Sequence, residues 1–138
     1  MIESTKIEFR HRRISDLDDV TDLAIMLFPG NRNQQHAAAR ILLELKANEE
    51  SLAALSPLER HYGISRRTLE RTRAKLARLG LIEHVTWMNS RYGGRQGWKL
   101  SSRMGSGLRQ LANRIDGWQG DKRPDRLAKD EQLVRLLR

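Results

Sequence analysis

The sequence predicts a small, mainly helical protein that carries one β-hairpin. Apolar side chains recur at helical spacing through most of the chain. A glycine-rich run at 89–97 separates two short segments rich in apolar, β-branched and aromatic residues. The length of 138 residues suits one domain with helical extensions, because domains cluster at roughly 100 to 150 residues. A TIM barrel or a two-domain enzyme does not fit this length.

The N-terminal part is predicted to contain a polar arm and one helix. Residues 1–14 are polar, with a basic cluster, and form either an edge strand or a disordered tail. Ser15 is expected to cap a helix over 15–28, because three aspartates follow in its first turn and suit the positive end of the helix dipole. A Pro-Gly pair ends this helix.

Two further helices are expected before the middle of the chain. Apolar spacing predicts a helix over 33–47, and 52–55 is either an apolar link or a short strand. Ser56 and Glu59 predict a capping box around a proline at the first helical position. Because Gly63 follows closely, this third helix must be short.

A longer basic helix and the hairpin come next. Ser65 is expected to cap a helix that runs to residue 79, and the glycine after it occupies the usual left-handed exit position. Segments 81–88 and 98–100 are the predicted strands, and 89–97 is the hairpin tip. Trp87 and Trp98 are expected to be core residues that face one another, or the helices, across the hairpin.

The C-terminal part is predicted to be helical. Ser101 or Ser102 begins a helix to about residue 115, whose expected buried stripe is Leu108, Leu111, Ala112 and Ile115. Residues 117–124 are the expected linker, and 125–138 a last helix with a thin apolar line of Leu127, Val134 and Leu137. The expected organisation is an N-terminal arm and helix at 1–32, a central domain at 33–116, and a linker and helix at 117–138.

The positive charge is concentrated in one segment. The formal net charge is +9, and residues 65–103 alone carry ten basic and two acidic side chains. Residues 1–64 carry a net charge of −2 and residues 104–138 a net charge of +3. A local excess of this sign favours a polyanionic partner, nucleic acid before an anionic membrane surface.

The order of the elements is that of a winged helix-turn-helix. A short helix, a tight turn at Gly63 and a longer helix must cross with their apolar residues in contact, and Leu58, Tyr62, Ile64 and Leu69 stand where that packing needs them. The fold class is therefore mainly α with a small β-hairpin, a winged helix-turn-helix with additional N- and C-terminal helices.

The windows 58–72, 76–83 and 98–105, with the hairpin between the last two, resemble winged-helix bacterial regulators of the MarR, PadR and GntR kinds. The resemblance covers about residues 35–115 and implies sequence-specific binding to duplex DNA. Glu59 stands where such motifs usually place a small residue, and Thr72 where an aliphatic residue is common. The GntR kind also carries a large ligand-binding domain for which no residues remain.

The predicted DNA-binding residues lie on the longer helix and at the hairpin tip. An arginine at the start of a recognition helix can bind guanine O6 and N7 together, which favours Arg66, Arg67 and Arg71 as base-reading residues. Arginines on a glycine-rich tip are expected at phosphates or in the minor groove. The full set is Ser65, Arg66, Arg67, Thr68, Glu70, Arg71 and Lys75 on the helix, and Arg91, Tyr92 and Arg95 on the tip.

The sequence predicts a cytoplasmic, dimeric transcriptional regulator that is not an enzyme. The apolar helices outside the central domain suggest a homodimer, and the longest apolar run, 23–28, is far too short to span a membrane. The four histidines lack metal-ligand spacing and the chain has no cysteine, so no metal, cofactor or catalytic residue is expected. A plasmid or phage replication or partition factor, and a winged helix used only for protein contact, remain alternatives.

Overall fold

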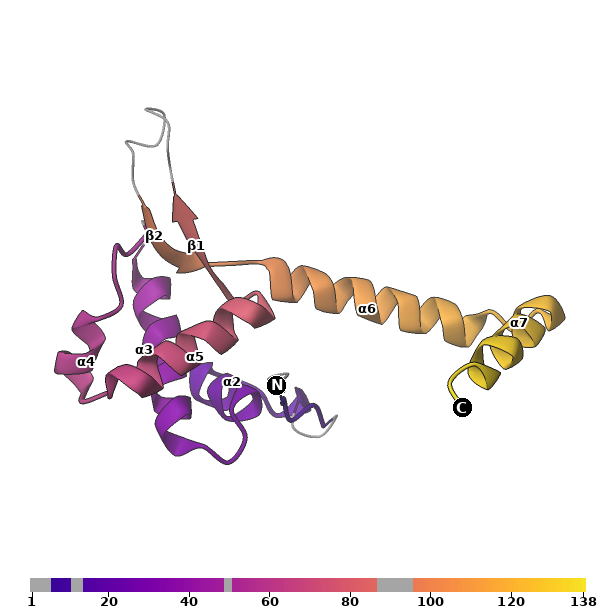
Figure 1. Ribbon diagram of the computed structural model, residues 1–138, viewed down its shortest axis with the longest axis horizontal. Helices are drawn as coiled ribbons and strands as arrows, with labels where there is room; N and C mark the ends of the chain where they lie inside the picture. Colours follow the sequence, from indigo (N-terminus) through magenta and orange to yellow (C-terminus); the bar gives the residue numbers. More distant parts are fainter. Residues whose placement is uncertain (1–5, 11–13, 49–50, 87–95) are drawn as a thin grey trace. The chain divides into compact units, whose positions relative to one another are not determined.

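The computed structural model describes residues 6–10, 14–48, 51–86 and 96–138. The chain forms two compact units, Met1–Met104 and Gly105–Arg138. The fold is mainly helical with a two-stranded antiparallel sheet, as the sequence predicts (Figure 1). The elements of the first unit are α2 (Val20–Leu27), α3 (Arg32–Ala47), α4 (Pro57–Tyr62), α5 (Arg66–Leu79), β1 (Ile82–Thr86) and β2 (Gln96–Leu100).

Helix α2 is shorter than the sequence predicts. Its cap is Asp19, whose side chain accepts a hydrogen bond from the Asp22 amide, and Ser15 lies outside the helix. The prediction of a helix from Ser15 was therefore wrong, because several residues in this stretch are suitable caps and only the packing of the following turn selects one. The helix ends at Leu27, and the predicted Pro-Gly stop is confirmed.

Helix α4 begins at Pro57, as predicted, but without a capping box. Ser56 has helical backbone angles and its side chain makes no cap hydrogen bond. The Glu59 amide instead donates to the Ser56 carbonyl oxygen at 3.0 Å. A capping box needs extended backbone at the cap residue, so the conformation of Ser56 excludes it.

The cap of α5 and the antiparallel hairpin agree with the sequence, whereas β2 begins at Gln96, two residues earlier than the predicted return strand. The Ser65 side chain accepts from the Thr68 amide at 3.1 Å, and Gly80 ends the helix in the left-handed conformation. In the hairpin, Ile82 pairs with Leu100 and His84 with Trp98. Trp98 is partly buried against the core, as predicted, whereas Trp87 lies outside the described residues.

The core of the first unit forms where α2, α3 and α5 meet. Helix α3 contacts α2, α5 and β2, and Figure 1 shows α5 crossing it. The predicted link at 52–55 touches the sheet at one point, where Leu52 and Trp98 exchange backbone hydrogen bonds of 2.9 and 2.7 Å. The largest fully buried side chains are Leu27, Phe28, Ile41, Thr72, Leu76 and Ile82.

Thr72 is the polar member of this core. Its side chain is 0% exposed, and its hydroxyl has no hydrogen-bond partner among the described residues. Thr72→Val keeps the shape and removes the unsatisfied group, so it should raise the free energy of unfolding by about 1 kcal/mol in urea. Thr68→Val on the same helix is the control and should gain nothing, because the Thr68 hydroxyl accepts from Ser65. A loss of stability in Thr72→Val would contradict the claim that the buried Thr72 hydroxyl has no hydrogen-bond partner.

The second unit is built from two helices. Helix α6 (Arg103–Gly120) begins in the first unit and continues through the predicted linker as far as Gly120. Helix α7 (Pro124–Arg135) follows, and neither helix has a buried residue. The predicted burial of the α6 stripe was wrong, because helical spacing identifies an apolar face but not what covers it.

Candidate nucleic-acid interface

The first turn of α5 is held in place by the turn that precedes it. Gly63 ends α4 at φ +63°, a left-handed conformation that glycine adopts without strain. Leu58, Ile64 and Leu69 are buried on the two sides of this turn, as the sequence predicts. Tyr62 is instead 36% exposed, with the Arg40 guanidinium 4.0 Å from its ring centroid. The three buried side chains thus pack both sides of the turn against the core.

One face of α5 is buried and the opposite face is basic. The buried side chains are Leu69, Thr72 and Leu76. At 3.6 residues per turn, the centre of the opposite face is the line through Arg67, Ala74 and Arg78. Arg67 and Arg78 are exposed there, with Arg71 exposed beside them. Ala74 was not among the residues predicted from the sequence, and its small side chain leaves the middle of this face open to close approach.

Arg66 is engaged by acidic neighbours. Its Nε lies 3.0 Å from Glu70 Oε1, one helical turn along α5. The hydrogen bond from Arg66 to Glu70, with the charges of Glu70 and Glu59, raises the pKa of its guanidinium above the ordinary value. In the described part of the chain, no carboxylate pairs with Arg67 or Arg71. These two arginines therefore present their charge more fully than Arg66 does.

Ser65 and Thr68 have a local structural role at the start of the helix. Besides capping α5, the Ser65 hydroxyl donates to Thr68 Oγ1 at 2.9 Å. The two hydroxyl groups thus bond to each other at the helix end. Thr68 is half-buried, and Ser65 is the more exposed of the two.

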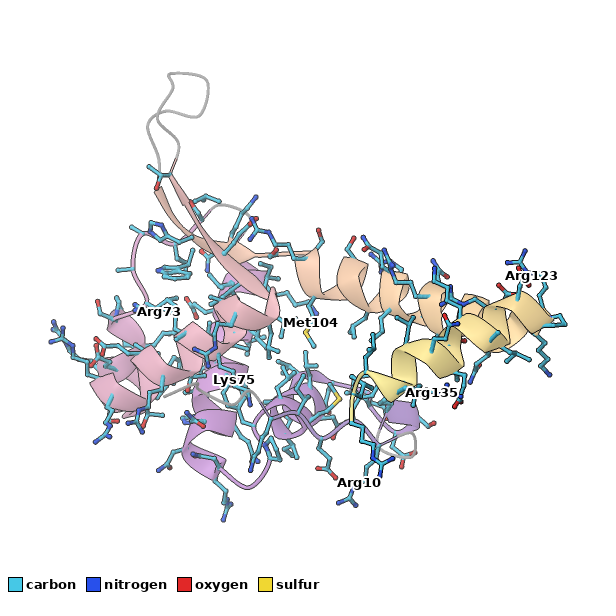
Figure 2. The ribbon with its side chains drawn as sticks, turned by 45° about the vertical axis from the view of Figure 1, so that its right-hand side comes forward. Arg10, Arg73, Lys75, Met104, Arg123 and Arg135 are labelled. Atoms are coloured by element: carbon cyan, nitrogen blue, oxygen red, sulfur yellow. The ribbon has the colours of Figure 1, made fainter. Side chains whose placement is uncertain are left out.

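Lys75 is held by backbone carbonyl groups of other segments. Its ammonium group donates to the carbonyl oxygens of Lys6, at 2.6 Å, and of Leu27. The ammonium group, on the side chain labelled Lys75 in Figure 2, also lies 4.5 Å from the centroid of the Phe28 ring. Burial, and secondarily the charge of Arg78, lowers the pKa of Lys75. The side chain joins the N-terminal segment and the end of α2 to α5, a role that its sequence position did not reveal.

Lys75→Met is expected to separate this role from DNA contact. The variant keeps an apolar stem but loses the two charge-assisted hydrogen bonds, so the free energy of unfolding should fall by about 1 to 2 kcal/mol. Urea denaturation measures that loss. If Lys75 serves only as this internal link, the salt dependence of duplex binding should not change. A shallower salt dependence with unchanged stability would instead make Lys75 a phosphate contact.

An open groove of about 530 Å³ runs beside α5. Phe28 and Ala74 contribute to its floor, and Glu70 is its acidic side chain. Its basic side chains are Lys6, Arg71, Lys75 and Arg78. Lys6 comes from the N-terminal arm, so the basic surface extends from the helix to a segment that sequence reasoning left without a role.

The base of the hairpin is joined to α5 through aromatic contacts. The guanidinium of Arg73, which is labelled in Figure 2, lies 5.1 Å from the Trp98 ring centroid, and His84 packs edge-on against the same ring at 5.0 Å. Strand β2 thus contacts α5 through Trp98 and Arg73, and His84 of β1 packs against the same ring. The predicted tip residues Arg91, Tyr92 and Arg95 lie outside the described residues.

Other kinds of site find no support in the part of the chain that the structure describes. There, no group of three histidine, cysteine or acidic side chains could hold a metal ion. None of the described helices is long and apolar enough to cross a membrane. No protein-family model, curated protein or solved structure was found to match the chain.

Proposed function

We propose that this chain is a winged helix-turn-helix protein that binds duplex DNA with α5 in the major groove. The observation that carries the proposal is the outward face of α5, where Arg67, Arg71 and Arg78 are exposed opposite the buried Leu69–Leu76 side. A capped helix that enters from a tight turn and displays arginines in its first turns is suited to reading base edges. In this proposal the hairpin that follows α5 acts as the wing.

The exposed arginines divide between base reading and phosphate contact. Arg67 and Arg71 lie in the first two turns of α5 without an acidic partner in the described residues, which favours them as base readers. Arg66 contributes less because Glu70 holds it. Arg78 and Lys6 line the groove beside the helix and are suited to phosphates. Arg91 and Arg95 add backbone or minor-groove contacts in this proposal, on the sequence evidence alone.

The biological role we propose is transcriptional regulation by a dimer. Two copies related by a two-fold axis would present two recognition helices to half-sites about one DNA turn apart. This arrangement requires a surface for self-association that leaves α5 free. The proposal involves no metal or cofactor.

A salt titration of duplex binding tests the proposal. If about six phosphates are neutralised, a plot of log affinity against log salt concentration should have a slope of about −5, from roughly −0.9 per phosphate. Fluorescence anisotropy of a labelled duplex measures the slope, and a single strand of the same length is the control. Absence of binding at low salt, or a slope near zero, would rule out the proposal.

A further inference from the structure

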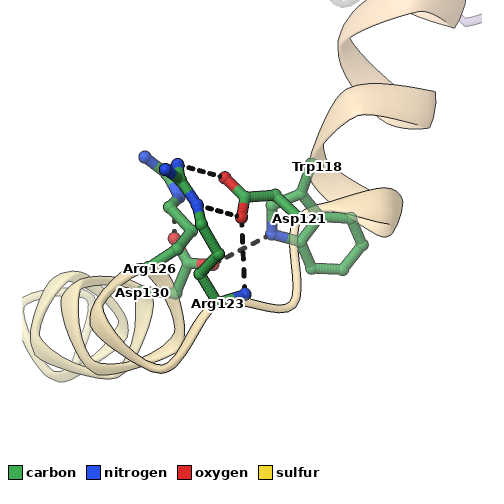
Figure 3. Close-up of polar contacts among 5 residues, drawn as sticks. All are labelled: Trp118, Asp121, Arg123, Arg126 and Asp130. Carbon is green, nitrogen blue, oxygen red and sulfur yellow. Dashed lines mark hydrogen bonds and ion pairs between the residues drawn. The ribbon is translucent and has the colours of Figure 1, made fainter.

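The second unit holds its two helices together by polar contacts. Asp121, between the helices, accepts from the Arg123 Nε at 2.8 Å, and Arg123 holds the pKa of that carboxyl below its usual value (Figure 3). The Trp118 indole N–H of α6 donates to Asp130 of α7 at 3.2 Å, and Asp130 also pairs with Arg126 at 3.2 Å. These contacts fix the connection and cover little apolar surface.

The apolar side chains of this unit are left exposed. On α6 the exposed fractions are 37% for Leu108, 51% for Leu111, 44% for Ile115 and 61% for Trp118. On α7 and beyond it, Leu127, Leu133, Val134, Leu136 and Leu137 are exposed as well. A unit below roughly 40 residues seldom folds by itself, and short helices in water are marginal. Ordered helices with this composition need a partner surface.

The spacing on α6 is that of a coiled-coil seam. Leu108, Leu111, Ile115 and Trp118 follow one another at intervals of three, four and three residues. Met104, four residues before Leu108, continues the line back to the first unit and packs against its core (Figure 2). Alternating steps of three and four residues make a narrow stripe that fits an identical stripe on another helix.

The positions beside the seam favour a second copy of the chain. They are Gly105, Gly107, Ala112, Arg114 and Gln119, of which only Arg114 is charged. The chain carries a net charge of +9, so two copies repel each other on average. The side chains on this face of α6 are mostly small and uncharged, so the α6 helices of two copies can approach closely with little charge repulsion.

We propose that the Leu108–Leu111–Ile115–Trp118 seam of α6 pairs with the same seam of a second copy and forms the homodimer. The sequence instead suggested dimerisation through the helices at 15–28 and 125–138, but the apolar side of α2 is covered, because Ala24, Met26 and Leu27 are buried in the first unit's own core. The inference supplies the two-fold arrangement on which the proposed function rests, but the pairing itself needs no DNA.

Sedimentation equilibrium of the full chain without DNA tests the seam. The wild type should dimerise at micromolar concentration. Leu111→Glu/Ile115→Glu should raise the dimer dissociation constant about 100-fold or more, because it places charges in the centre of the interface. Gln110→Glu/Asn113→Glu adds the same charge on other faces of α6 and should change the constant less than about 3-fold. A wild type that stays monomeric at about 100 μM, or equal effects of the two pairs, would overturn the proposal.

A cross-linking experiment does not depend on whether the charged variant folds. The natural chain has no cysteine, so a single introduced thiol reports on its own position. Leu111→Cys should be joined to a second copy by a short bismaleimide, and Asn113→Cys should not. If the two cysteine variants cross-link equally, or if neither cross-links, the proposed pairing through the seam is wrong.

Two further measurements, vesicle flotation and duplex binding, test other partners for the seam and separate the seam from the proposed function. A monomeric chain that floats with anionic vesicles would assign the seam to a lipid surface instead. If the chain is monomeric and the thiol of Leu111→Cys does not react with the bismaleimide, the seam packs against the chain's own first unit instead. A chain that dimerises but does not bind duplex DNA would support the seam and refute the proposed function. A wild type that binds duplex DNA as a monomer would support DNA binding and refute the seam.

Discussion

Arg67→Ala should weaken binding to the preferred duplex by about 10- to 100-fold, which corresponds to roughly 1 to 3 kcal/mol for one bidentate base contact. Arg67 lies at the centre of the outward face of α5 and has no acidic partner among the described residues. Affinity for random duplex should fall only by the small factor expected from one lost charge. The preferred duplex is obtained by selection from a random library with the wild-type chain, and both affinities are measured by anisotropy.

Two matched variants give this prediction its specificity. Arg66→Ala removes the same charge one position earlier, but Glu70 already holds that guanidinium, so its loss should be smaller. Arg32→Ala removes an exposed arginine at the start of α3 and should affect both duplexes alike and only slightly. Equal losses on preferred and random duplex for Arg67→Ala would make Arg67 a phosphate contact, and no loss would remove it from the interface.

Gly97→Ala should destabilise the first unit by about 3 kcal/mol or more, because strain and a backbone clash act together. Gly97 is at φ +154°, and a Cβ there would lie 2.3 Å from the Leu52 carbonyl oxygen. That oxygen accepts from the Trp98 amide, so relief of the clash would break the bridge between the 52–55 link and the sheet. Urea denaturation followed by tryptophan fluorescence measures the loss.

Gly117→Ala is the control for the same chemical change. A Cβ at Gly117 meets nothing within 4 Å, and alanine is the better helix former, so stability should rise or stay the same. If Gly97→Ala unfolded at the wild-type urea concentration, the close approach of the two backbones would be disproved.

Local signals in the sequence predicted the parts of the fold that depend on neighbouring residues. Ser65 as the cap of α5, Gly80 as its exit and the pairing of two strands around 89–97 each follow from short-range chemistry, and the structure has them. The same kind of signal failed at Ser15 and Ser56. In both places a suitable cap residue is present, but α2 is capped by Asp19 instead, and Ser56 has helical backbone angles that do not allow it to cap α4.

The candidate interface was predictable as a face but not in its details. Helical spacing placed Arg66, Arg67, Glu70 and Arg71 on the outer side of α5, where they are exposed. It did not reveal that Arg66 bonds to Glu70, since that depends on rotamers. Nor did it reveal that Lys75 reaches carbonyl oxygens 69 and 48 residues away along the chain. Contacts of this range require the fold.

The exposed stripe of α6 shows a further limit of periodicity. The spacing of Leu108, Leu111 and Ile115 identified an apolar face, and burial within the chain was inferred from it. In the structure these side chains remain exposed. An apolar stripe indicates that a helix face must be buried against a partner. The spacing does not reveal whether that partner is the same chain or another molecule.

The placement of α5 in the major groove is tested most directly by methylation protection. Dimethyl sulfate modifies guanine N7 in the major groove and adenine N3 in the minor groove. With the preferred duplex and the full chain, we predict protection of guanine N7 in each half-site, and loss of that protection at one guanine in Arg67→Ala at equal occupancy. Protection confined to adenine N3, or unprotected guanines on a saturated duplex, would contradict the account.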